Sequence, residues 1–571
     1  MSENINLREI FNTAVQNLKE NNVNIAIENF EKILKLDPKH ISTNLYLGII
    51  YAQNKNFDKA SGFFNKVIQI KPYVVEAHNN LGLIHLEKNE KEKARKYFEK
   101  AIQVNPNFVE AHNNLGFILM NSGDLETAEK CFKKSIEINP KYLPAYLNYG
   151  NLNKNLGKIE NAEKIFQEAI KIDPKYFDAY NNLMVLYERL NQHEKLKNII
   201  NKADEQFKSN PVVMLFYGQY LYKTEKFSEA IKILENINFN TSQLNRERLR
   251  CFIIAKSYDQ IENSEKAFDF FKKSNSISLN LKSENIDKNK TLDIIKKRFL
   301  FFNNDQIKSW PKNNSKNLNE NPIFLIGFPR SGTTLLDTIL RTHSSIQVIE
   351  EKPIVGKFVN ELNKITHEDF TNLKNINDND SKELRQVYFD IRAKYIDNQD
   401  STKIYIDKMP LNIIHIAEII RIFPEAKFLV SIRHPYDCVL SCFMQSFKLN
   451  DAMANFLNLN DTANLYNEVM RLWMQYKNIS YLNYHYIKYE ELVSNFEISV
   501  KKIFNFIEID WSDEVFKFYN TATKRNLIST PSYDQVNKPI YSKAVGRWKK
   551  YESNFSEIAP ILKPWIKNFN Y

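Results

Sequence analysis

The N-terminal part of the sequence repeats itself at a fixed interval of 34 residues. From about residue 8 to about residue 210, residues of four types return in phase. They are Pro38, Pro72, Pro106, Pro140 and Pro174; Ala26, Ala60, Ala94, Ala128 and Ala162; Phe30, Phe64, Phe98, Phe132 and Phe166; and Gly48, Gly82, Gly116 and Gly150. This interval fits one helix–turn–helix unit, which buries its apolar face only by stacking on its neighbours. The sequence therefore predicts an all-α solenoid here.

The spacing resembles the tetratricopeptide repeat. In such a unit, Gly and Ala let helices approach closely, Phe fills the space between helix pairs, and Pro begins the next unit by ending the preceding helix. Gln206–Leu234 and Lys256–Ile277 have the pattern of further, divergent repeats. We expect the solenoid over residues 1–305, with a linker rich in Asn and Pro at 306–321.

A repeat solenoid presents a concave groove, which suits a protein or peptide as its partner. One asparagine recurs at the same repeat position, as Asn80, Asn114, Asn148 and Asn182. A side-chain amide both donates and accepts hydrogen bonds, so this ladder could hold the backbone of a bound chain. The alternative is that these asparagines pack adjacent helices together.

Length and composition set further limits. A chain of 571 residues is too long for one hydrophobic core, so at least two domains are expected. The net charge of +11 is spread along the chain and does not indicate a nucleic-acid partner. Four cysteines without a CxxC pair argue against a disulfide framework or a metal site. The polar N-terminus and the absence of an apolar run of about 20 residues predict no membrane span and a cytoplasmic location.

After the linker, the pattern changes to short apolar segments that alternate with helices. Ile323–Ile326, Ile404–Ile406 and Ala426–Ile432 are the expected strands, which predicts an α/β domain with a mainly parallel sheet. The first strand leads into GFPRSGTT at 327–334, where two glycines have the G-x4-G spacing of a phosphate loop. The lysine of the nucleoside-triphosphate motif is replaced by Thr333, while the backbone amides still favour an anion.

A second element follows, FPEAKFLVSIRHPYDCVLSCFMQSF at 423–447, which predicts a strand, Arg433 and a helix that carries Ser441. Arg offers a two-pronged donor to phosphate and Ser a hydroxyl. The alternative pairs Arg433 with Asp437 and buries Ser441 in the helix.

These two elements together resemble sulfotransferases, over about residues 322–571. The likeness is greatest to protein-tyrosine sulfotransferases and to bacterial repeat–sulfotransferase fusions. YIDKMPLN at 405–412, IKYEELV at 487–493 and NKPIYSKAVGRWKKYE at 537–552 also fit. The resemblance implies an N-terminal all-α solenoid followed by an α/β, P-loop-like sulfotransferase domain at 322–571.

The resemblance also implies the donor 3′-phosphoadenosine 5′-phosphosulfate, with adenosine 3′,5′-bisphosphate as product and no metal. The resemblance implies that the loop at 327–334 binds the 5′-phosphosulfate of this donor and that the strand–helix element at 423–447 binds its 3′-phosphate. The implied cofactor-binding residues are Arg330, Ser331, Gly332, Thr333, Thr334, Arg433, Ser441, Tyr489 and Lys538. Tyr489 could equally be a packing residue. Gly546, Arg547 and Trp548 are expected to close over the nucleotide, with a structural role for Trp548 as the alternative.

By the same resemblance, Glu351 is the general base, with Glu350 as its rival, and Lys408 and Arg330 complete the catalytic set. A carboxylate can take the acceptor proton, and fixed cations stabilise charge on the transferring group and the leaving phosphate. Either Ser529 or Ser532 is expected near the sulfate.

The acceptor stays open at this stage. Protein tyrosine is the leading expectation, with the solenoid binding the acceptor or a partner. Pro353, however, stands where animal tyrosine-sulfating enzymes carry an arginine. A sugar or small-molecule hydroxyl, or a repeat scaffold with an inactive catalytic domain, are the alternatives. A nucleotide kinase is disfavoured because the phosphate-loop lysine is absent. A homodimer is left open.

Overall fold

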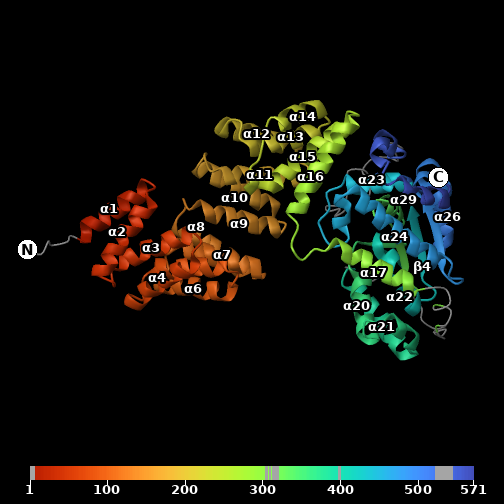
Figure 1. Cartoon of the computed structure of the whole chain (residues 1–571), viewed down its shortest axis with the longest axis horizontal. Helices are drawn as coiled ribbons and strands as arrows, with labels where there is room; N and C mark the ends of the chain where they lie inside the picture. The colour runs from red at the N-terminus through yellow and green to blue at the C-terminus, as the bar shows by residue number, and fades with distance from the viewer. Residues whose placement is uncertain are drawn as a thin grey trace, which may run out of the picture. The chain divides into compact units, whose positions relative to one another are not determined.

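The computed structural model describes residues 7–302, 307, 310, 321–396, 400, 402–520 and 544–571. The chain forms two compact units, Met1–Tyr220 and Leu221–Tyr571. Figure 1 shows helices throughout the first and a strand-bearing core in the second. Most of the predicted linker, together with Ser529, Ser532 and Lys538, lies outside the described residues.

The first unit is a stack of antiparallel helix pairs, which confirms the predicted all-α repeat solenoid. Each repeat contributes one pair, and each pair also packs on the next. The helices are α1 Leu7–Lys19, α2 Val23–Leu36, α3 Ile41–Gln53, α4 Phe57–Ile70, α5 Val75–Glu87, α6 Lys91–Val104, α7 Val109–Ser122, α8 Leu125–Ile138, α9 Leu143–Asn155, α10 Ile159–Ile172, α11 Phe177–Arg189, α12 His193–Phe207 and α13 Pro211–Lys223.

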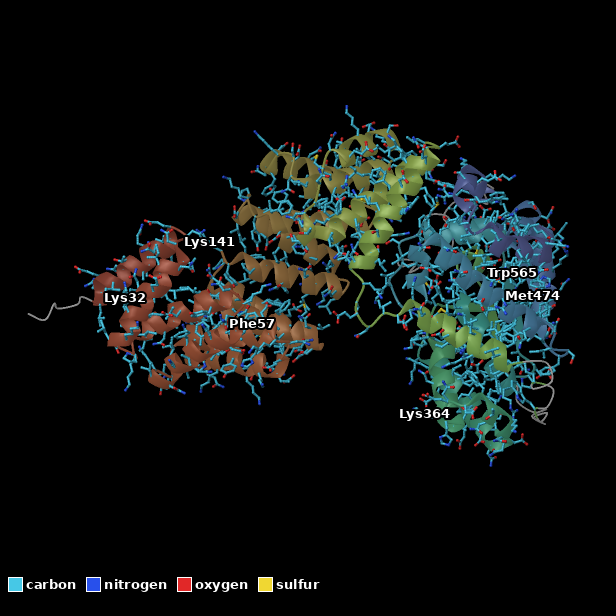
Figure 2. All side chains as sticks on the ribbon, in the orientation of Figure 1. Lys32, Phe57, Lys141, Lys364, Met474 and Trp565 are labelled. Atoms are coloured by element: carbon cyan, nitrogen blue, oxygen red, sulfur yellow. The ribbon has the colours of Figure 1, made fainter. Side chains whose placement is uncertain are left out.

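The repeated residues make the contacts that their periodicity predicts. The five repeat alanines and five repeat phenylalanines are 0% exposed. At each of the four repeat glycines, an added Cβ atom would lie 2.4 to 2.7 Å from the phenylalanine ring of the same helix pair. The second helix of a pair ends two residues before the repeat proline, as α4 does at Ile70 before Pro72. Exposed lysines, Lys32 and Lys141 among them, lie on the outside (Figure 2).

Replacing the repeat glycine of α5 should destabilise the solenoid. A Cβ atom at Gly82 would lie 2.5 Å from Cε1 of Phe98, a ring that is fully buried and cannot withdraw. We expect Gly82→Ala to lower the free energy of unfolding by about 1–3 kcal/mol. Gly62, inside α4, is the matched control, because nothing lies within 4 Å of its added Cβ. Gly62→Ala should instead stabilise the chain, by about 1 kcal/mol from helix propensity. Urea unfolding followed by circular dichroism would measure both, and equal midpoint shifts would contradict the assignment.

The second unit opens with helices and continues into the strands. The helices are α14 Phe227–Glu235, η1 Thr241–Gln243, α15 Leu244–Gln260, α16 Ser264–Asn280 and α17 Lys288–Phe301. Although the sequence groups them with the repeats, they lie in the second compact unit. For example, α17 packs on α24 (Leu459–Lys477), and Arg298 of α17 forms a buried ion pair with Glu418.

Five parallel strands form the sheet, in the order β2-β3-β1-β4-β5. They are β1 Ile323–Gly327, β2 Ile346–Glu350, β3 Ile404–Lys408, β4 Lys427–Ile432 and β5 Asn483–Lys488. The remaining helices are α19 Thr333–Leu340, α20 Ile354–Thr366, η2 Phe370–Asn375, α21 Asp378–Ala393, η3 Pro410–His415, α22 Ile416–Ile422, α23 Pro435–Phe443, η4 Met453–Leu457, α25 Tyr489–Ser494, α26 Phe496–Ile507, η5 Asp513–Lys517, η6 Arg547–Phe555 and α29 Ala559–Asn568. The α/β class with a parallel sheet is therefore confirmed.

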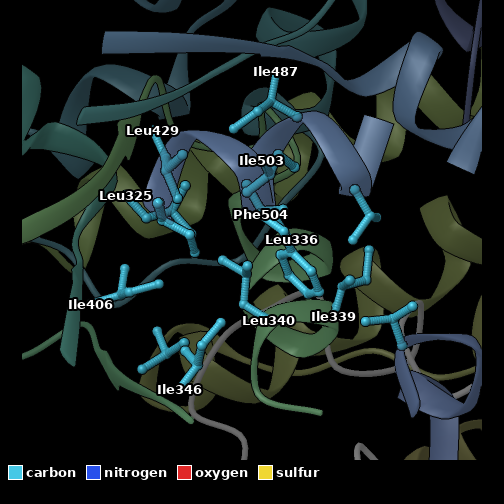
Figure 3. Close-up of a cluster of buried hydrophobic side chains, with 14 of the residues drawn as sticks. Leu325, Leu336, Ile339, Leu340, Ile346, Ile406, Leu429, Ile487, Ile503 and Phe504 are labelled. Atoms are coloured by element: carbon cyan, nitrogen blue, oxygen red, sulfur yellow. The ribbon is translucent and has the colours of Figure 1, made fainter. Parts of the chain in front are cut away.

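Apolar side chains cover both faces of the sheet. On one face, Leu325 and Leu429 pack with Leu336 of α19 and with Ile503 and Phe504 of α26 (Figure 3). On the other face, the Phe324 ring stacks on Phe428 and meets Tyr388 of α21. Burial on both faces explains why the two central strands β1 and β4 are short, mostly apolar runs. No described helix combines the length and the apolar character needed to cross a bilayer.

Candidate functional site

The candidate site lies at the carboxyl ends of β1 and β4. The chain leaves β1 towards β2 at one edge of the sheet, whereas β4 lies on the other side of β1. Parallel α/β sheets bind ligands at such a switch point, beyond the carboxyl ends of the strands. Residues 328–332 of the predicted 327–334 loop follow β1, and Arg433 follows β4, so the fold brings the two sequence elements to one place.

The loop after β1 needs its two glycines. An added Cβ at Gly327 would lie 2.4 Å from the backbone oxygen of Ser431, so β4 permits no side chain there. Gly332 has φ +108°, and its Cβ would lie 2.7 Å from Cδ2 of Tyr489. Arg330 adopts φ 69° although it is not glycine. Such a conformation costs free energy and persists only where the surroundings impose it.

The side chains that the sequence assigns to two separate elements meet in the structure. Nε of Arg330 donates to Oγ of Ser441, on α23, at 3.0 Å. Nη1 of Arg433 donates to the backbone oxygen of Arg330 at 3.2 Å. The Arg433 guanidinium lies over the ring of Tyr489, 4.9 Å from its centre. Four predicted residues from four elements therefore form one cluster.

Asp437 forms hydrogen bonds that differ from the predicted alternative. Its two carboxylate oxygens accept from the backbone amides of Gly546 at 2.7 Å and Trp548 at 2.9 Å. Nη2 of Arg433 donates to the backbone oxygen of Ala544. Asp437 thus anchors the segment 544–548, and Arg433 lies between that segment and the β1 loop.

The cluster is strongly cationic and suited to an anion. Burial lowers the pKa of Arg330, and the charges of Arg433 and Arg547 lower it further. The buried Oγ of Ser331 and Nε of Arg433 have no hydrogen-bond partner in the described part of the chain. Helix α19 begins with the backbone amides of Thr333 and Thr334, both buried residues. A helix N-terminus adds positive potential at this place.

A second group of charges lies at the ends of β2 and β3. Nζ of Lys408 is 2.7 Å from Oε1 of Glu351 and 3.6 Å from Oε1 of Glu350. The Lys408 side chain is 0% exposed, Glu350 9% and Glu351 33%. Of the two acids, Glu351 is therefore the more exposed to solvent. Strand β2, which the sequence pattern did not predict, carries Glu350 and leads into Glu351.

Several residues that support the loop were not predicted. Sγ of Cys438 and of Cys442 both donate to the backbone oxygen of Pro329, at 3.2 and 3.3 Å. Oγ of Ser431 donates to the backbone oxygen of Ser331 at 2.9 Å. The i, i+4 spacing of the cysteines was a usable signal, because it places both thiols on one helix face.

The asparagine ladder of the first unit forms hydrogen bonds within the solenoid. Nδ2 of Asn114 donates to Asn79 at 3.0 Å, and Nδ2 of Asn148 donates to Asn113 at 2.9 Å, each across adjacent repeats. Nδ2 of Asn80 and of Asn182 donate to carbonyls of their own helices. These contacts agree with the packing alternative, and a role in gripping a bound chain stays a prediction.

Asp407, which precedes Lys408, should make stability depend on pH. Burial raises the pKa of this carboxyl to about 7, while the Tyr388 hydroxyl donates to it at 3.3 Å. The folded pKa exceeds the unfolded value, so this group destabilises the fold as pH rises from about 4 to about 7. Asp407→Asn removes that cost, which is at most about 4 kcal/mol. The buried amide that it introduces costs about 1–3 kcal/mol of stability in turn.

We therefore expect the unfolding midpoint of Asp407→Asn, relative to the parent chain, to rise between pH 4 and pH 7 and to level off above it. Urea unfolding of both chains across this range would measure the difference. A difference that stays constant with pH would mean that Asp407 is not protonated in the fold.

Known proteins with similar sequences match both units. Residues 322–513 match the model of the sulfotransferase family, and residues 17–75, 75–108, 109–142 and 143–176 match tetratricopeptide-repeat models. An uncharacterised protein of Aquifex aeolicus is 26% identical over 349 residues, which are 59% of this chain and 44% of that protein. Protein-tyrosine sulfotransferase A of Caenorhabditis elegans is 24% identical over 256 residues, 42% of this chain and 66% of its own. Protein-tyrosine sulfotransferase of Drosophila melanogaster is 25% identical over 255 residues, 42% and 50% respectively. The chain thus spans less than two thirds of each relative.

Proposed function

Because the chain joins tetratricopeptide repeats to a sulfotransferase-family domain, we propose that it transfers a sulfuryl group from 3′-phosphoadenosine 5′-phosphosulfate to an acceptor hydroxyl. Protein tyrosine is the proposed acceptor. One observation carries the proposal: Arg330 and Arg433, from separate strand ends, lie in one cluster that joins Ser441 and Tyr489. Two of the relatives above bear the name of protein-tyrosine sulfotransferases.

The residues present fit this donor. The Ser331 hydroxyl and Nε of Arg433 are buried donors without a partner in the described part of the chain, and each suits a phosphate or sulfate oxygen. Gly332 makes room for the Tyr489 ring, because an added Cβ would lie 2.7 Å from Cδ2 of that ring. Arg330 and residues 331–334 would hold the 5′-phosphosulfate, and Arg433 and Ser441 the 3′-phosphate. Lys538 would join them from outside the described residues.

We assign the steps of this reaction to residues at the strand ends. The acceptor oxygen bonds to sulfur, the bond between sulfur and the phosphate oxygen breaks, and adenosine 3′,5′-bisphosphate leaves. Glu351 takes the acceptor proton, since it is the exposed member of the acid pair. Lys408 and Arg330 stabilise negative charge on the transferring group and on the leaving phosphate oxygen. Lys408 is held ready for this by its ion pair with Glu351.

A nucleoside triphosphate fits the same loop less well. In the nucleotide-triphosphatase motif, the residue after the second glycine is a lysine that reaches the β- and γ-phosphates. Here that position is Thr333, at the start of α19 and 3% exposed. The cations of this site come instead from Arg330 in the loop and Arg433 beyond β4.

We assign the repeat unit to binding the acceptor protein or a partner that presents it. Tetratricopeptide repeats stack into a continuous surface that can hold a segment of another chain. A polypeptide acceptor would bind to that surface, whereas a sugar or small-molecule acceptor needs no second unit for its binding.

Transfer of radiolabelled sulfate from the donor tests the proposal. The full chain is incubated with labelled donor and either a tyrosine-containing peptide mixture or host lysate, and the labelled species are separated. We expect label on protein, released as tyrosine sulfate after digestion. Label on a sugar or small molecule would replace the acceptor class. No transfer to any fraction, by a chain that is folded, would favour a scaffold with an inactive domain.

A further inference from the structure

We propose that Asp259, on α15, positions the segment 544–548 beside Arg330 and Arg433. The α15–α16 helix pair is then a working part of the nucleotide site, although it lies before the region that matches the sulfotransferase model. The role at a nucleotide site depends on the proposed function, whereas the positioning itself depends only on the contacts below.

The segment 544–548 forms one wall of the arginine cluster. It receives Nη2 of Arg433 at the Ala544 oxygen and presents the Gly546 and Trp548 amides to Asp437. The Trp548 ring stacks on His434, with centres 5.2 Å apart and planes 11° apart. Moving this segment would therefore release Arg433 on one side and Asp437 on the other.

Asp259 contacts the same segment at Arg547, and it contacts η6 beyond this segment at Tyr551. Its carboxylate accepts from Nη2 of Arg547 at 2.7 Å and from Nε at 3.2 Å, and the Tyr551 hydroxyl donates to it at 2.7 Å. The Asp259 side chain is only 8% exposed. A two-pronged pair between arginine and a shielded carboxylate fixes orientation as well as distance.

The helix pair that carries Asp259 is itself fixed to the site. Nδ2 of Asn275, on α16, donates to the Phe443 oxygen at the end of α23, and the Phe268 ring stacks on Phe443 at 5.0 Å. Arg248 donates to Oγ of Ser446 at 2.7 Å. Helix α23 also carries Asp437 and Ser441. The α15–α16 pair and the segment 544–548 are therefore both attached to the region of α23.

Two roles for Asp259 predict opposite results. If it serves only as a counter-ion, removing its charge leaves Arg547 uncompensated near Arg330, and an anion should bind more tightly. If it positions the segment, removing it loosens Gly546 and Trp548 together with the Arg433 contact, and binding should weaken. Asp259→Asn keeps the shape and removes the charge, so the sign of the change separates the two roles.

The experiment uses the full chain and two readouts. Hydrogen exchange with mass spectrometry follows peptides that cover 544–555, and calorimetry measures the affinity for adenosine 3′,5′-bisphosphate. For Asp259→Asn we expect at least tenfold faster exchange of this segment and about tenfold weaker binding. The donor KM should rise in parallel while kcat at saturating donor stays within about twofold, a division that a loss of folded protein would not produce.

Glu262→Gln is the matched control. Glu262 lies three residues after Asp259 in the sequence and pairs with Lys550. Its side chain is 72% exposed, so the loss of this pair should change neither readout. Tyr551→Phe deletes one of the hydrogen bonds to Asp259 and should give a smaller shift in the same direction, even if Asp259→Asn does not fold. Unchanged exchange, or tighter nucleotide binding, in the Asp259 and Tyr551 variants would overturn the positioning role. If the parent chain bound no bisphosphate, the proposed function would fail, and exchange would still decide whether Asp259 places the segment.

Discussion

Arg330→Ala should abolish sulfuryl transfer, with a loss of about 10³-fold or more in kcat/KM for the donor. Arg330 is the predicted cation inside the anion loop, and its side chain also fixes Ser441 through a 3.0 Å hydrogen bond. Its removal takes away both the charge and the hydrogen bond to Ser441, whereas the bond from Arg433 to the backbone oxygen of residue 330 remains. Transfer of labelled sulfate under donor-limited conditions would measure the loss.

Two further substitutions separate the causes. Arg330→Lys keeps the charge but cannot form two parallel hydrogen bonds to one anion. We therefore expect an intermediate loss in kcat/KM of about 10- to 100-fold. Arg471→Ala is the matched control, because Arg471 lies in the same unit, half-exposed and paired with Glu468. It should stay within about threefold of the parent. Activity of Arg330→Ala close to that of the parent would remove the loop from the proposed mechanism.

Glu351→Gln should lower kcat by about 10²- to 10⁴-fold and leave the donor KM nearly unchanged. The amide keeps the size of the side chain and can still accept a hydrogen bond from Lys408, so the geometry of the strand ends survives. What is lost is a group that accepts the proton of the acceptor. Steady-state kinetics with saturating donor and varied acceptor would measure the effect.

Glu350→Gln is the comparison that makes this test specific. Glu350 lies 3.6 Å from the same lysine but is only 9% exposed, so we expect a smaller loss in kcat, below about tenfold. A large loss for Glu350→Gln with full turnover by Glu351→Gln would reverse the assignment of the base.

Local patterns were sufficient to predict the repeats and the anion loop. The 34-residue phase predicted close helix approach at the repeat glycines, and the Gly82–Phe98 contact confirms it. The loop and the Arg433 element were predictable because each is a continuous strand–turn–helix motif. Their convergence followed from parallel strands that present the same end, which Arg330 and Arg433 confirm by contact.

Contacts between residues far apart in the sequence were not predictable. Asp259 and Arg547 are 288 positions apart, and nothing in either segment indicates the other. Strand β5, with the sequence NYHYIK, has mostly half-buried residues and lacks the apolar run that marks a central strand. The contacts of α16 with Phe443 of α23, and of α15 with Ser446 just after it, could not be inferred from the repeat-like periodicity of these helices, because that periodicity describes how helices pair and not what covers them.

A crystal structure of the full chain with adenosine 3′,5′-bisphosphate would test the central claim most directly. The account predicts one nucleotide per chain, with its 5′-phosphate on the loop amides and Arg330 and its 3′-phosphate on Arg433 and Ser441. A nucleotide bound elsewhere, or one that touches Arg330 or Arg433 but not both, would contradict it.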